Sequence, residues 1–594
     1  MAFPARSLRI LACLAFSLAA AVTAKQYSNV ADLPQSTYDF VIVGGGNAGL
    51  VVANRLTENR AWSVLVIEAG PSNLGILDEE VPALAGTLFA PDSPYTWKYT
   101  VVPQENADNR QPGIPRGKML GGSTAINEMW YTRGSAEDFD RFAAATGDKG
   151  WSWDEMLPYF LKNEKWTEPA DKHNTTGQYN PAAHGKTGIT AVSLPGYAWP
   201  IFDLVTETAA SMPDEFPFVL DYNAGKPIGL GWTQTTINGG FRDSSARSYL
   251  AEQYISRPNL HVLVTAQVSR VLPASKGSTH FTKVEFSQDF KTLHTVTATK
   301  EIVLSAGSIA TPQILLQSGI GNSTTLKRIG ITPLVDLPAV GQNMTEQPLL
   351  SNSWFANTTQ SYESFNLNAT QMEIDLALWN KTHTGPLVST SGAQVAFLRV
   401  PENSSILSTF ADPAAGPNTP HIELEFTYPS CRCLACKPSV PINRHHRCSD
   451  LILGGSVTLN ETDPSPWNLP VIDTGLFREE FDFQTMVYAV KQIFKFFAAP
   501  VWDGYLLQPL DALVPALQSD AGLEAYIRGN VINNQHPVGT SGMSPKGASW
   551  GKVTGIRVID ASVLPYVTSG HTMAPTYAFA ERGADLVKAT WAHH

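Results

Sequence analysis

The stretch that decides the fold is Asp39-Phe40-Val41-Ile42-Val43-Gly44-Gly45-Gly46-Asn47-Ala48-Gly49-Leu50. A short apolar run rich in β-branched residues leads into Gly-x-Gly-x-x-Gly, and residues 51–56 then read as a helix. A strand, a tight glycine turn and a helix in this order place backbone N–H groups and the positive helix end against a pyrophosphate. We expect Gly44 to permit the turn, Gly46 to let the phosphate approach, and Gly49 to let helix and strand pack.

A second predicted strand, residues 63–67, ends in Glu68, about twenty residues after the turn. An acidic side chain at this distance accepts hydrogen bonds from the ribose hydroxyls of an adenine dinucleotide. The glycine pattern alone is weak evidence, because a glycine-rich turn is more often only a turn. Together with Glu68 it predicts a dinucleotide-binding domain, for NAD or FAD.

Length and charge limit the remaining possibilities. A chain of 594 residues is too long for one core, so we expect two domains, which can be interleaved. The net charge is −11 and no basic run occurs, which argues against nucleic acid and anionic membrane surfaces as partners. After the first residues, no apolar stretch has the length needed to span a bilayer.

The N-terminus, residues 1–24, has the pattern of a secretory signal peptide. Arg6 and Arg9 precede an apolar centre over 10–22, and Val22-Thr23-Ala24 offers a small-residue cleavage site. A buried helix is the alternative interpretation. We expect a secreted, extracellular glycoprotein, and the N-glycosylation sequons support this: Asn174, Asn322, Asn343, Asn357, Asn368, Asn380, Asn403 and Asn460.

Further segments extend the dinucleotide-binding half along the chain. The loop at 116–127 pairs Gly121 and Gly122 with Ser123 and Thr124, and can either bring backbone donors to a phosphate or flavin or be a flexible surface loop. We expect an alternating strand over 259–268, then a strand, glycine turn and helix over 301–316 with Pro312 in the first helical turn. A strand at 556–560 and a final helix at about 575–588 complete this half. The dinucleotide domain is therefore predicted to be discontinuous, with a second domain capping it.

With these segments in place, the chain resembles the glucose–methanol–choline (GMC) family of flavin oxidoreductases over nearly all of its mature length. The resemblance rests on the glycine turn with Glu68, on 116–127, on 307–321, and on the pair His536-Pro537 and His571. It implies an α/β fold: a discontinuous FAD-binding Rossmann-like domain with an α+β substrate-binding cap. We place the FAD-binding domain at 36–150, 236–340 and 531–594, and the substrate domain at 151–235 and 341–530.

The resemblance also assigns roles to residues. His536 matches the base that takes the proton of an alcohol while hydride passes to the flavin N5, and imidazole has a suitable pKa for this step. His571 matches the second residue, which hydrogen-bonds the substrate oxygen. The expected FAD-binding residues are Gly44, Gly46, Asn47, Ala48, Gly49, Glu68, Arg116, Gly121, Gly122, Ser123, Asn127, Val268 and Asp560.

Two groups within the family are similar to different parts of this chain. Residues 135–142, 146–151 and 412–418 are similar to fungal aryl-alcohol oxidases. Residues 216–221 and 225–227 are more similar to pyranose dehydrogenases. We slightly favour a primary-alcohol oxidoreductase of the aryl-alcohol oxidase type, using O2 or a quinone as acceptor, with sugar oxidation as the alternative.

Single positions depart from these groups. Ile126 stands where pyranose dehydrogenases tether the flavin through a His, so we predict non-covalent FAD. Glu128 and Gln535 stand where aryl-alcohol oxidases carry aromatic residues, which makes the substrate pocket more polar and suits a sugar.

Two segments differ from the family pattern. The stretch 550–557 is shorter than usual, and the run Cys431, Cys433, Cys436, His445, His446 and Cys448 is foreign to it. The run can pair as disulfides, ligate zinc or be a translated intron, and we predict no metal. These departures also leave open a catalytically impaired flavin-binding relative, or a non-redox lyase, and we expect a monomer.

Overall fold

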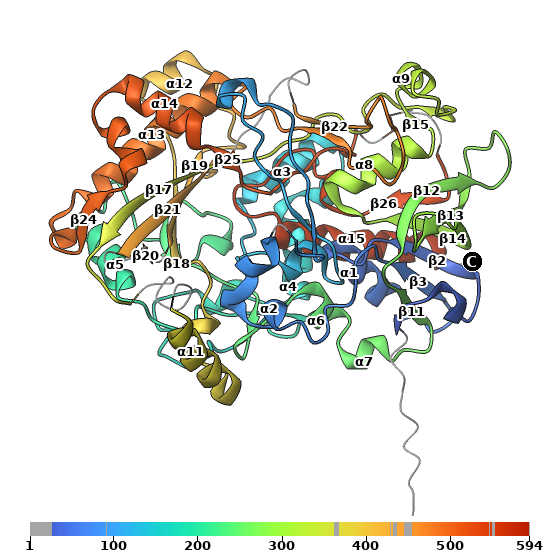
Figure 1. Cartoon of the computed structure of the whole chain (residues 1–594), viewed down its shortest axis with the longest axis horizontal. Helices are drawn as coiled ribbons and strands as arrows, with labels where there is room; N and C mark the ends of the chain where they lie inside the picture. The colour runs from blue at the N-terminus through green and yellow to red at the C-terminus, as the bar shows by residue number, and fades with distance from the viewer. Residues whose placement is uncertain are drawn as a thin grey trace, which may run out of the picture.

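The structure, a computed structural model, describes residues 26–90, 92–360, 368–427, 429–431, 436–444, 454–545, 547–548 and 553–592. Its two main sheets lie side by side, one at the right and one at the left of Figure 1. The predicted signal peptide lies outside the described residues. So do Cys433, His445, His446, Cys448, residues 550–552 and the side chains of Cys431 and Cys436, so the alternatives for these segments stay open.

The first sheet collects strands from distant parts of the chain. Its order is β1 (Gln26–Tyr27), β11 (Leu260–Leu263), β3 (Val64–Ile67), β2 (Thr37–Val43), β14 (His294–Leu304), β13 (Phe281–Ser287) and β12 (Gln267–Pro273), and β26 (Ile556–Val558) also pairs with β14. The neighbours β1, β11, β3, β2 and β14 pair in parallel, and β26 is parallel to β14. The pairs β14–β13 and β13–β12 are antiparallel. This is the discontinuous α/β sheet that the sequence predicts.

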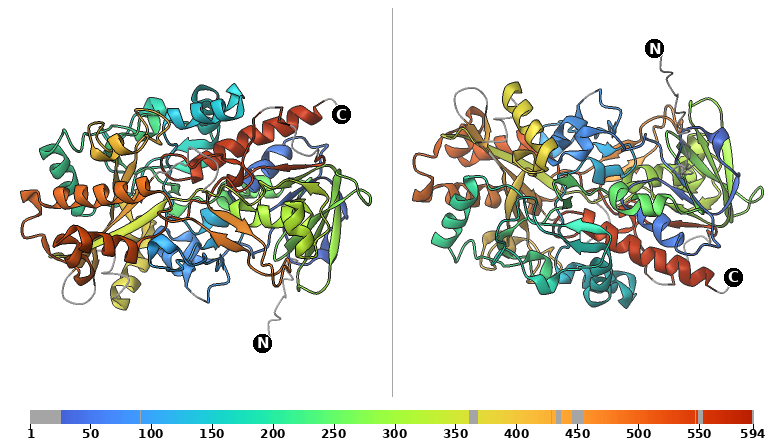
Figure 2. Two further views of the ribbon diagram at one scale, coloured as in Figure 1. Left: turned by 90° about the horizontal axis from the view of Figure 1, so that it is seen from above. Right: turned by 90° about the horizontal axis from the view of Figure 1, so that it is seen from below.

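Helices cover both faces of this sheet. Phe40 and Ile42 of β2 pack on the face that carries α1 (Asn47–Leu56) and α15 (Met573–Trp591), while Val41 and Val43 belong to the core under α8 (Gly307–Gln317). Figure 2 shows α15 along one side of the sheet. Because both faces are buried, β2 and β3 are apolar throughout, as parallel strands between helices are.

One predicted strand is wrong. Residues 259–268 form two strands, β11 and β12, separated at Thr265, whose φ is 52°. The backbone N–H groups of Thr265 and Ala266 leave the ladder and donate to the carbonyls of Gly70 and Glu68. After the break, Ala266, Gln267 and Val268 line the same cavity as Glu68, and the alternating pattern in the sequence does not reveal this bend.

Pro312 lies further into α8 than expected. The helix begins at Gly307, which puts Pro312 in its second turn. Proline has no N–H for the carbonyl of Ser308, four residues earlier. The hydroxyl of Thr540 donates to that carbonyl instead, at 2.7 Å, and connects α8 to the C-terminal segment.

The second sheet belongs to the cap. Its strands run β24 (Leu506–Pro509), β17 (Pro348–Ala356), β21 (Cys436–Arg444), β19 (Ile422–Thr427), β18 (Gly392–Leu398) and β8 (Gly229–Trp232), all antiparallel. α5 (Ile201–Ser211), α13 (Glu480–Phe497) and α14 (Asp520–Asn530) pack against it in one large apolar core.

Two elements pack with the other sheet than the one in whose predicted domain range they lie. α4 (Trp153–Asn163) packs against α15 and shares the core of the first sheet, because Met156 and Phe160 face Phe139 and Phe579. β25 (Ile532–Asn533), in contrast, pairs with β17 of the cap.

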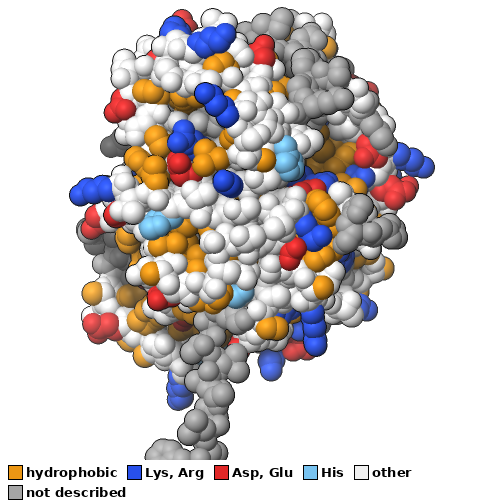
Figure 3. Space-filling model, turned by 90° about the vertical axis from the view of Figure 1, so that its right-hand side faces the viewer, with side chains coloured by type: hydrophobic (Ala, Val, Ile, Leu, Met, Phe, Trp, Pro, Cys, Tyr) orange, Lys and Arg blue, Asp and Glu red, His pale blue; other side chains and the backbone are white. Residues whose placement is uncertain are grey.

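Two further features of the molecule are its surface charge and the length of its helices. Figure 3 shows charged side chains of both signs scattered over the end of the molecule that carries the first sheet, without a field of one sign. Within the described ranges, none of the helices is both long and apolar enough to cross a bilayer.

Candidate functional site: a dinucleotide cavity ending at two histidines

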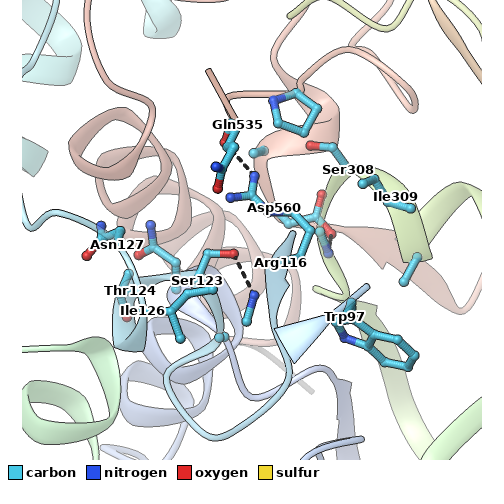
Figure 4. Close-up of a pocket in the computed structure, with 18 of the residues that line it drawn as sticks. Trp97, Arg116, Ser123, Thr124, Ile126, Asn127, Ser308, Ile309, Gln535 and Asp560 are labelled. Carbon is cyan, nitrogen blue, oxygen red and sulfur yellow. Dashed lines mark hydrogen bonds between the residues drawn. The ribbon is translucent and has the colours of Figure 1, made fainter. Parts of the chain in front are cut away.

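A cavity of about 630 Å³ extends from the glycine turn after β2 to the cap. Figure 4 shows part of its lining, in which Arg116 donates a hydrogen bond to the backbone carbonyl of Gln535. Most of the predicted site residues line it: Gly44, Gly46, Asn47, Ala48, Glu68, Arg116, Gly122, Ser123, Asn127, Glu128, Val268, Gln535, His536, Asp560 and His571. Gly49 and Gly121 do not line the cavity, and lie behind it.

The glycine turn is constrained by contacts that a side chain would prevent. Gly44 has φ 100°, and a Cβ there would lie 2.4 Å from the carbonyl oxygen of Ser305. A Cβ on Gly49 would lie 2.0 Å from the carbonyl oxygen of Gly44. These two glycines therefore serve the turn and the packing of α1 against β2.

Gly46 has a different environment. The nearest atom to a Cβ built there is the Cα of Gly122, at 3.6 Å, so the protein itself leaves space at this position. A Cβ on Gly122 would lie only 2.7 Å from the Cα of Gly46. The loop at 121–122 thus lies against the glycine turn, and both present backbone to the cavity.

Glu68 ends β3 at the edge of this cradle. Its carboxylate accepts the N–H groups of Gly45 and Gly70, both at 2.8 Å. Burial raises the pKa of Glu68, while these two hydrogen bonds and Lys118 oppose the rise. The carboxylate therefore fixes the turn, and its predicted role as the acceptor of ribose hydroxyls stays a prediction.

Asp560 holds the second helix that borders the cavity. One of its oxygens accepts the N–H of Gly307 at 2.9 Å and the hydroxyl of Thr311 at 2.6 Å, and the other accepts the N–H of Ser562. Burial raises the pKa of Asp560, against these hydrogen bonds. The carboxylate links the start of α8 to the segment after β26.

The cradle fits an adenine dinucleotide. α1 begins at Asn47 after Gly46, and among the described residues no side chain caps its first N–H groups, which leaves them to an anion. The Asn47 side chain donates to the carbonyl of Met573, while its buried oxygen has no hydrogen-bond partner within the described part of the chain. Gly44, Gly46, Asn47 and Glu68 would hold the adenine and pyrophosphate half of FAD.

At the other end of the cavity, the rings of His536 and His571 pack edge to face. Their centroids are 5.0 Å apart and the planes make an angle of 79°. His536 Nδ1 lies 2.7 Å from Gln347 Oε1 and 3.0 Å from Asn534 Nδ2, and its backbone N–H donates to Glu346 at 2.8 Å.

His571 lies between the cap and the first domain. Its backbone N–H donates to the hydroxyl of Thr132 at 2.6 Å, and its ring packs against Trp130 with centroids 5.1 Å apart. Its Nδ1 lies 3.5 Å from Glu423 and its Nε2 3.6 Å from Glu425. Burial alone would lower the pKa of His571, but the two carboxylates outweigh it and the pKa is raised.

Glu128 borders the same end of the cavity. The Glu128 side chain is exposed, but it lines the cavity and is therefore surrounded by protein. Burial raises the pKa of Glu128; Glu425 adds to the rise, while Arg242 and a hydrogen bond from Ser391 oppose it. Glu128 therefore adds a carboxylate to the cavity that Glu425 and His571 also line.

Four residues at the site were missed in the sequence. Glu346 and Gln347, just before β17, contact His536, and Glu423 and Glu425 of β19 contact His571; both pairs are far away in the chain. The signal for the last two was available: in β19, Ile422-Glu423-Leu424-Glu425-Phe426 alternates acidic and apolar residues within a buried strand.

Metal ligation has one geometric candidate in the described ranges. The ligand atoms of Glu423, Glu425 and His571 lie within 4.8 Å of one another. The ion pairs with a His571 of raised pKa account for this arrangement without a metal.

Comparisons with known proteins agree with this geometry. Two family profiles, each described as GMC oxidoreductase, match residues 38–349 and 454–580. The chain is 39% identical to dehydrogenase eriK of Hericium erinaceus, over 96% of this chain and 98% of that protein. It is 38% identical to pyranose dehydrogenase 3 of Leucoagaricus meleagris, over 95% of each chain.

Solved structures show the same fold. A formate oxidase from Aspergillus oryzae superposes with a TM-score of 0.84 at 26% identity, over 93% of this chain and 98% of that one. A fungal aryl-alcohol oxidase superposes with a TM-score of 0.80 at 26% identity, over 94% of this chain and 100% of that one. With the dinucleotide cradle and the histidine pair at opposite ends of one cavity, these matches show that the chain belongs to the GMC oxidoreductase family and is an FAD-dependent oxidoreductase.

Proposed function

We propose that the protein oxidises a CH–OH group of a small, hydroxyl-rich substrate, a sugar or related polyol, to the carbonyl compound. The observation that carries this proposal is the edge-to-face pair His536 and His571, bordered by Glu128 and Gln535 in one cavity. Carboxylate and amide groups at this end suit a substrate with several hydroxyls. The 38% identity to a pyranose dehydrogenase supports the same substrate class.

In this proposal the two histidines have different roles toward the substrate hydroxyl. His536 takes the hydroxyl proton of the substrate, and His571, whose pKa Glu423 and Glu425 raise, donates a hydrogen bond to the substrate oxygen. FAD, when bound, supplies the acceptor for the hydride that leaves the carbon. The protein's contribution is to hold the C–H and O–H bonds in the orientation that both transfers require.

A second candidate substrate is an aryl alcohol. Phe89, Trp97 and Tyr99 line the same cavity, and Trp97 stacks on Tyr99 with ring centroids 5.6 Å apart. An aromatic substrate could pack on such side chains. The fold shared with a fungal aryl-alcohol oxidase supports this candidate less strongly, at 26% identity.

Anaerobic rapid mixing distinguishes the candidates. Purified protein is mixed with sugars, polyols and benzyl alcohols. The bleaching of the absorption band of oxidised flavin, at about 450 nm, is then followed. Faster bleaching with sugars supports the proposal, and faster bleaching with benzyl alcohols supports the second candidate. No bleaching with any alcohol contradicts both and favours an impaired or non-redox relative.

The acceptor, the flavin linkage and the location complete the proposal. We infer that reduced flavin is reoxidised by a quinone or by O2, and repeating the mixing with each acceptor separates them. Ile126 is buried beside the cavity, and its apolar side chain supports non-covalent FAD. Flavin that stays on the polypeptide after acid precipitation would contradict this.

We also propose that the protein is a secreted, glycosylated monomer. Six of the sequon asparagines are exposed: Asn174, Asn322, Asn357, Asn368, Asn380 and Asn403. Protein recovered from the medium of the producing cells should begin after Ala24 and lose mass on endoglycosidase treatment. Sedimentation of that protein at the monomer mass tests the oligomeric state.

A further inference from the structure

The strand pairing that carries His536 contains an insertion. Thr345 pairs with Val538 and Pro348 with Asn533, so the two residues 346–347 lie opposite the four residues 534–537. The extra residues bulge out of the ladder, and Gln535 has φ 67°. Because of this bulge, Gln535 and His536 both line the cavity.

Neighbouring side chains satisfy the backbone groups that the bulge removes from the ladder. Glu346 Oε1 accepts the N–H groups of His536 and of Gln347, each at 2.8 Å. Arg116 donates to the carbonyl of Gln535 at 2.5 Å. The backbone at Gln535 and His536 is therefore held from both sides, which fixes the position of the His536 Cβ from which the ring extends.

The ring is held by Gln347, which is fully buried and does not line the cavity. Its Nε2 donates to the carbonyl oxygens of Thr568 at 3.2 Å and of Gly570 at 3.4 Å. Carbonyl oxygens only accept hydrogen bonds, so these contacts fix which end of the amide is the nitrogen. The amide oxygen must then face His536 Nδ1, at 2.7 Å.

An acceptor this close to Nδ1 stabilises the tautomer with its proton on Nδ1, which leaves the lone pair of the neutral ring on Nε2. We infer that Gln347 is a positioning residue that selects this tautomer of His536 and so makes Nε2 the atom that takes the substrate proton. The inference rests on the proposed role of His536 as the base.

Asn534 offers a competing contact. Its Nδ2 lies 3.0 Å from His536 Nδ1 and would favour the opposite tautomer if it donated there. The same nitrogen lies 3.4 Å from Gln347 Oε1, which is a second acceptor for it. The shorter contact of Gln347, with its amide orientation fixed by two carbonyls, favours the proton on Nδ1.

Nitrogen NMR of the holoenzyme labelled with ¹⁵N-histidine tests the inference directly. The spectrum is recorded at a pH where His536 is neutral, and His536→Asn identifies its signals by their loss. We expect a protonated Nδ1 and an unprotonated Nε2 in the wild type. Gln347→Met, of similar size but without the acceptor, should move proton density to Nε2 and slow flavin reduction by at least about tenfold.

Two further variants separate tautomer control from a structural role. Gln347→Glu keeps a carbonyl acceptor and, when protonated, a donor for Thr568 and Gly570, so it should retain the Nδ1 proton and much of the rate. Asn534→Ala should also retain the Nδ1 proton.

A wild-type spectrum with the proton on Nε2 overturns the inference, and so does a tautomer unchanged in Gln347→Met. If Gln347→Met does not fold, the wild-type and Asn534→Ala spectra still decide. A wild type with the expected tautomer that no alcohol reduces contradicts the proposed function and leaves the tautomer assignment standing.

Discussion

At the residue scale, the two histidines of the cavity have opposite surroundings. His536 contacts amide groups, Gln347 and Asn534, whereas His571 contacts the carboxylates of Glu423 and Glu425. The two carboxylates raise the pKa of His571, whereas the amide groups of Gln347 and Asn534 beside the His536 ring carry no charge. This asymmetry matches one base and one hydrogen-bond donor acting on the same substrate oxygen.

His536→Ala is expected to slow flavin reduction by at least about a hundredfold, because the substrate hydroxyl then loses its general base. Stopped-flow reduction with the best substrate of the panel measures the effect. His173→Ala, at a partly exposed site far along the chain where the ring contacts Asp171 and Gln178, serves as the control. A near-normal rate in His536→Ala would remove this residue from the role of base.

Glu425→Gln is expected to lower the pKa of His571. Burial alone lowers this pKa and the negative charges of Glu423 and Glu425 raise it, so the loss of one charge shifts it downward. The alkaline limb of the pH profile of flavin reduction should therefore move to lower pH. Glu252→Gln, at an exposed position of α7 (Glu252–Ile255), is the matched control and should leave the limb in place.

At the scale of elements, the glycine turn shows what a sequence can and cannot reveal. Strand, turn, helix and Glu68 were predictable because they depend on contacts within about thirty residues, a range that local patterns report well. The break at Thr265 was not, because it depends on the carbonyls of Gly70 and Glu68, almost two hundred residues away. Glu346 and Gln347 were missed for the same reason, since strand pairing alone brings them to His536.

A pair of glycine substitutions tests the two roles within the turn. Gly49→Ala would put a Cβ 2.0 Å from the carbonyl of Gly44, which separates helix from strand and should cost at least about 2 kcal/mol of unfolding free energy. Gly46→Ala meets no protein atom closer than 3.6 Å, so the apoprotein should stay close to wild-type stability. Its methyl group would instead occupy the phosphate position and weaken FAD retention.

Denaturant unfolding of the apoproteins and flavin release measure these effects. Equal loss of stability in both variants would contradict the distinction between packing and cofactor approach. Retention of FAD by Gly46→Ala would show that the pyrophosphate lies elsewhere in the cavity.

At the scale of the whole molecule, two domains of separate cores meet around one cavity, and the buried titratable groups are distributed over both. Burial raises the pKa of Asp243 to about 7, and likewise that of Glu346 to about 7, in each case against nearby hydrogen bonds. The pKa of His571 is also raised, as is that of His184, where Glu164 and Asp221 outweigh burial. The family, the cofactor and the sheet were predictable from the sequence, whereas this electrostatic pattern depends on packing between distant segments.

These shifts predict that stability falls as pH rises. A group whose folded pKa exceeds its unfolded value stabilises the protein at low pH, and this stabilisation is lost as pH rises through the folded pKa. Asp243 and Glu346 therefore each lose up to about 3 kcal/mol between about pH 5 and 8, and both histidines act in the same direction. The thermal midpoint should be highest at mildly acidic pH and lower at about pH 8.

Differential scanning calorimetry of the holoenzyme across this range measures the trend. Glu346→Gln and Asp243→Asn should each flatten the decline, because neither new side chain titrates. A midpoint that rises toward pH 8 would contradict the shifts at these buried groups.

The bulge opposite residues 346–347 has a consequence for engineering the substrate range. Arg116 holds Gln535 through its backbone carbonyl and not through its side chain, and regular pairing resumes on both sides of the bulge. The side chain at position 535 can thus be varied in a library among residues that adopt φ 67°, which excludes β-branched ones, while the pairing on both sides and the anchoring of His536 are kept. Directed evolution of this enzyme toward bulkier or more apolar alcohols should begin there.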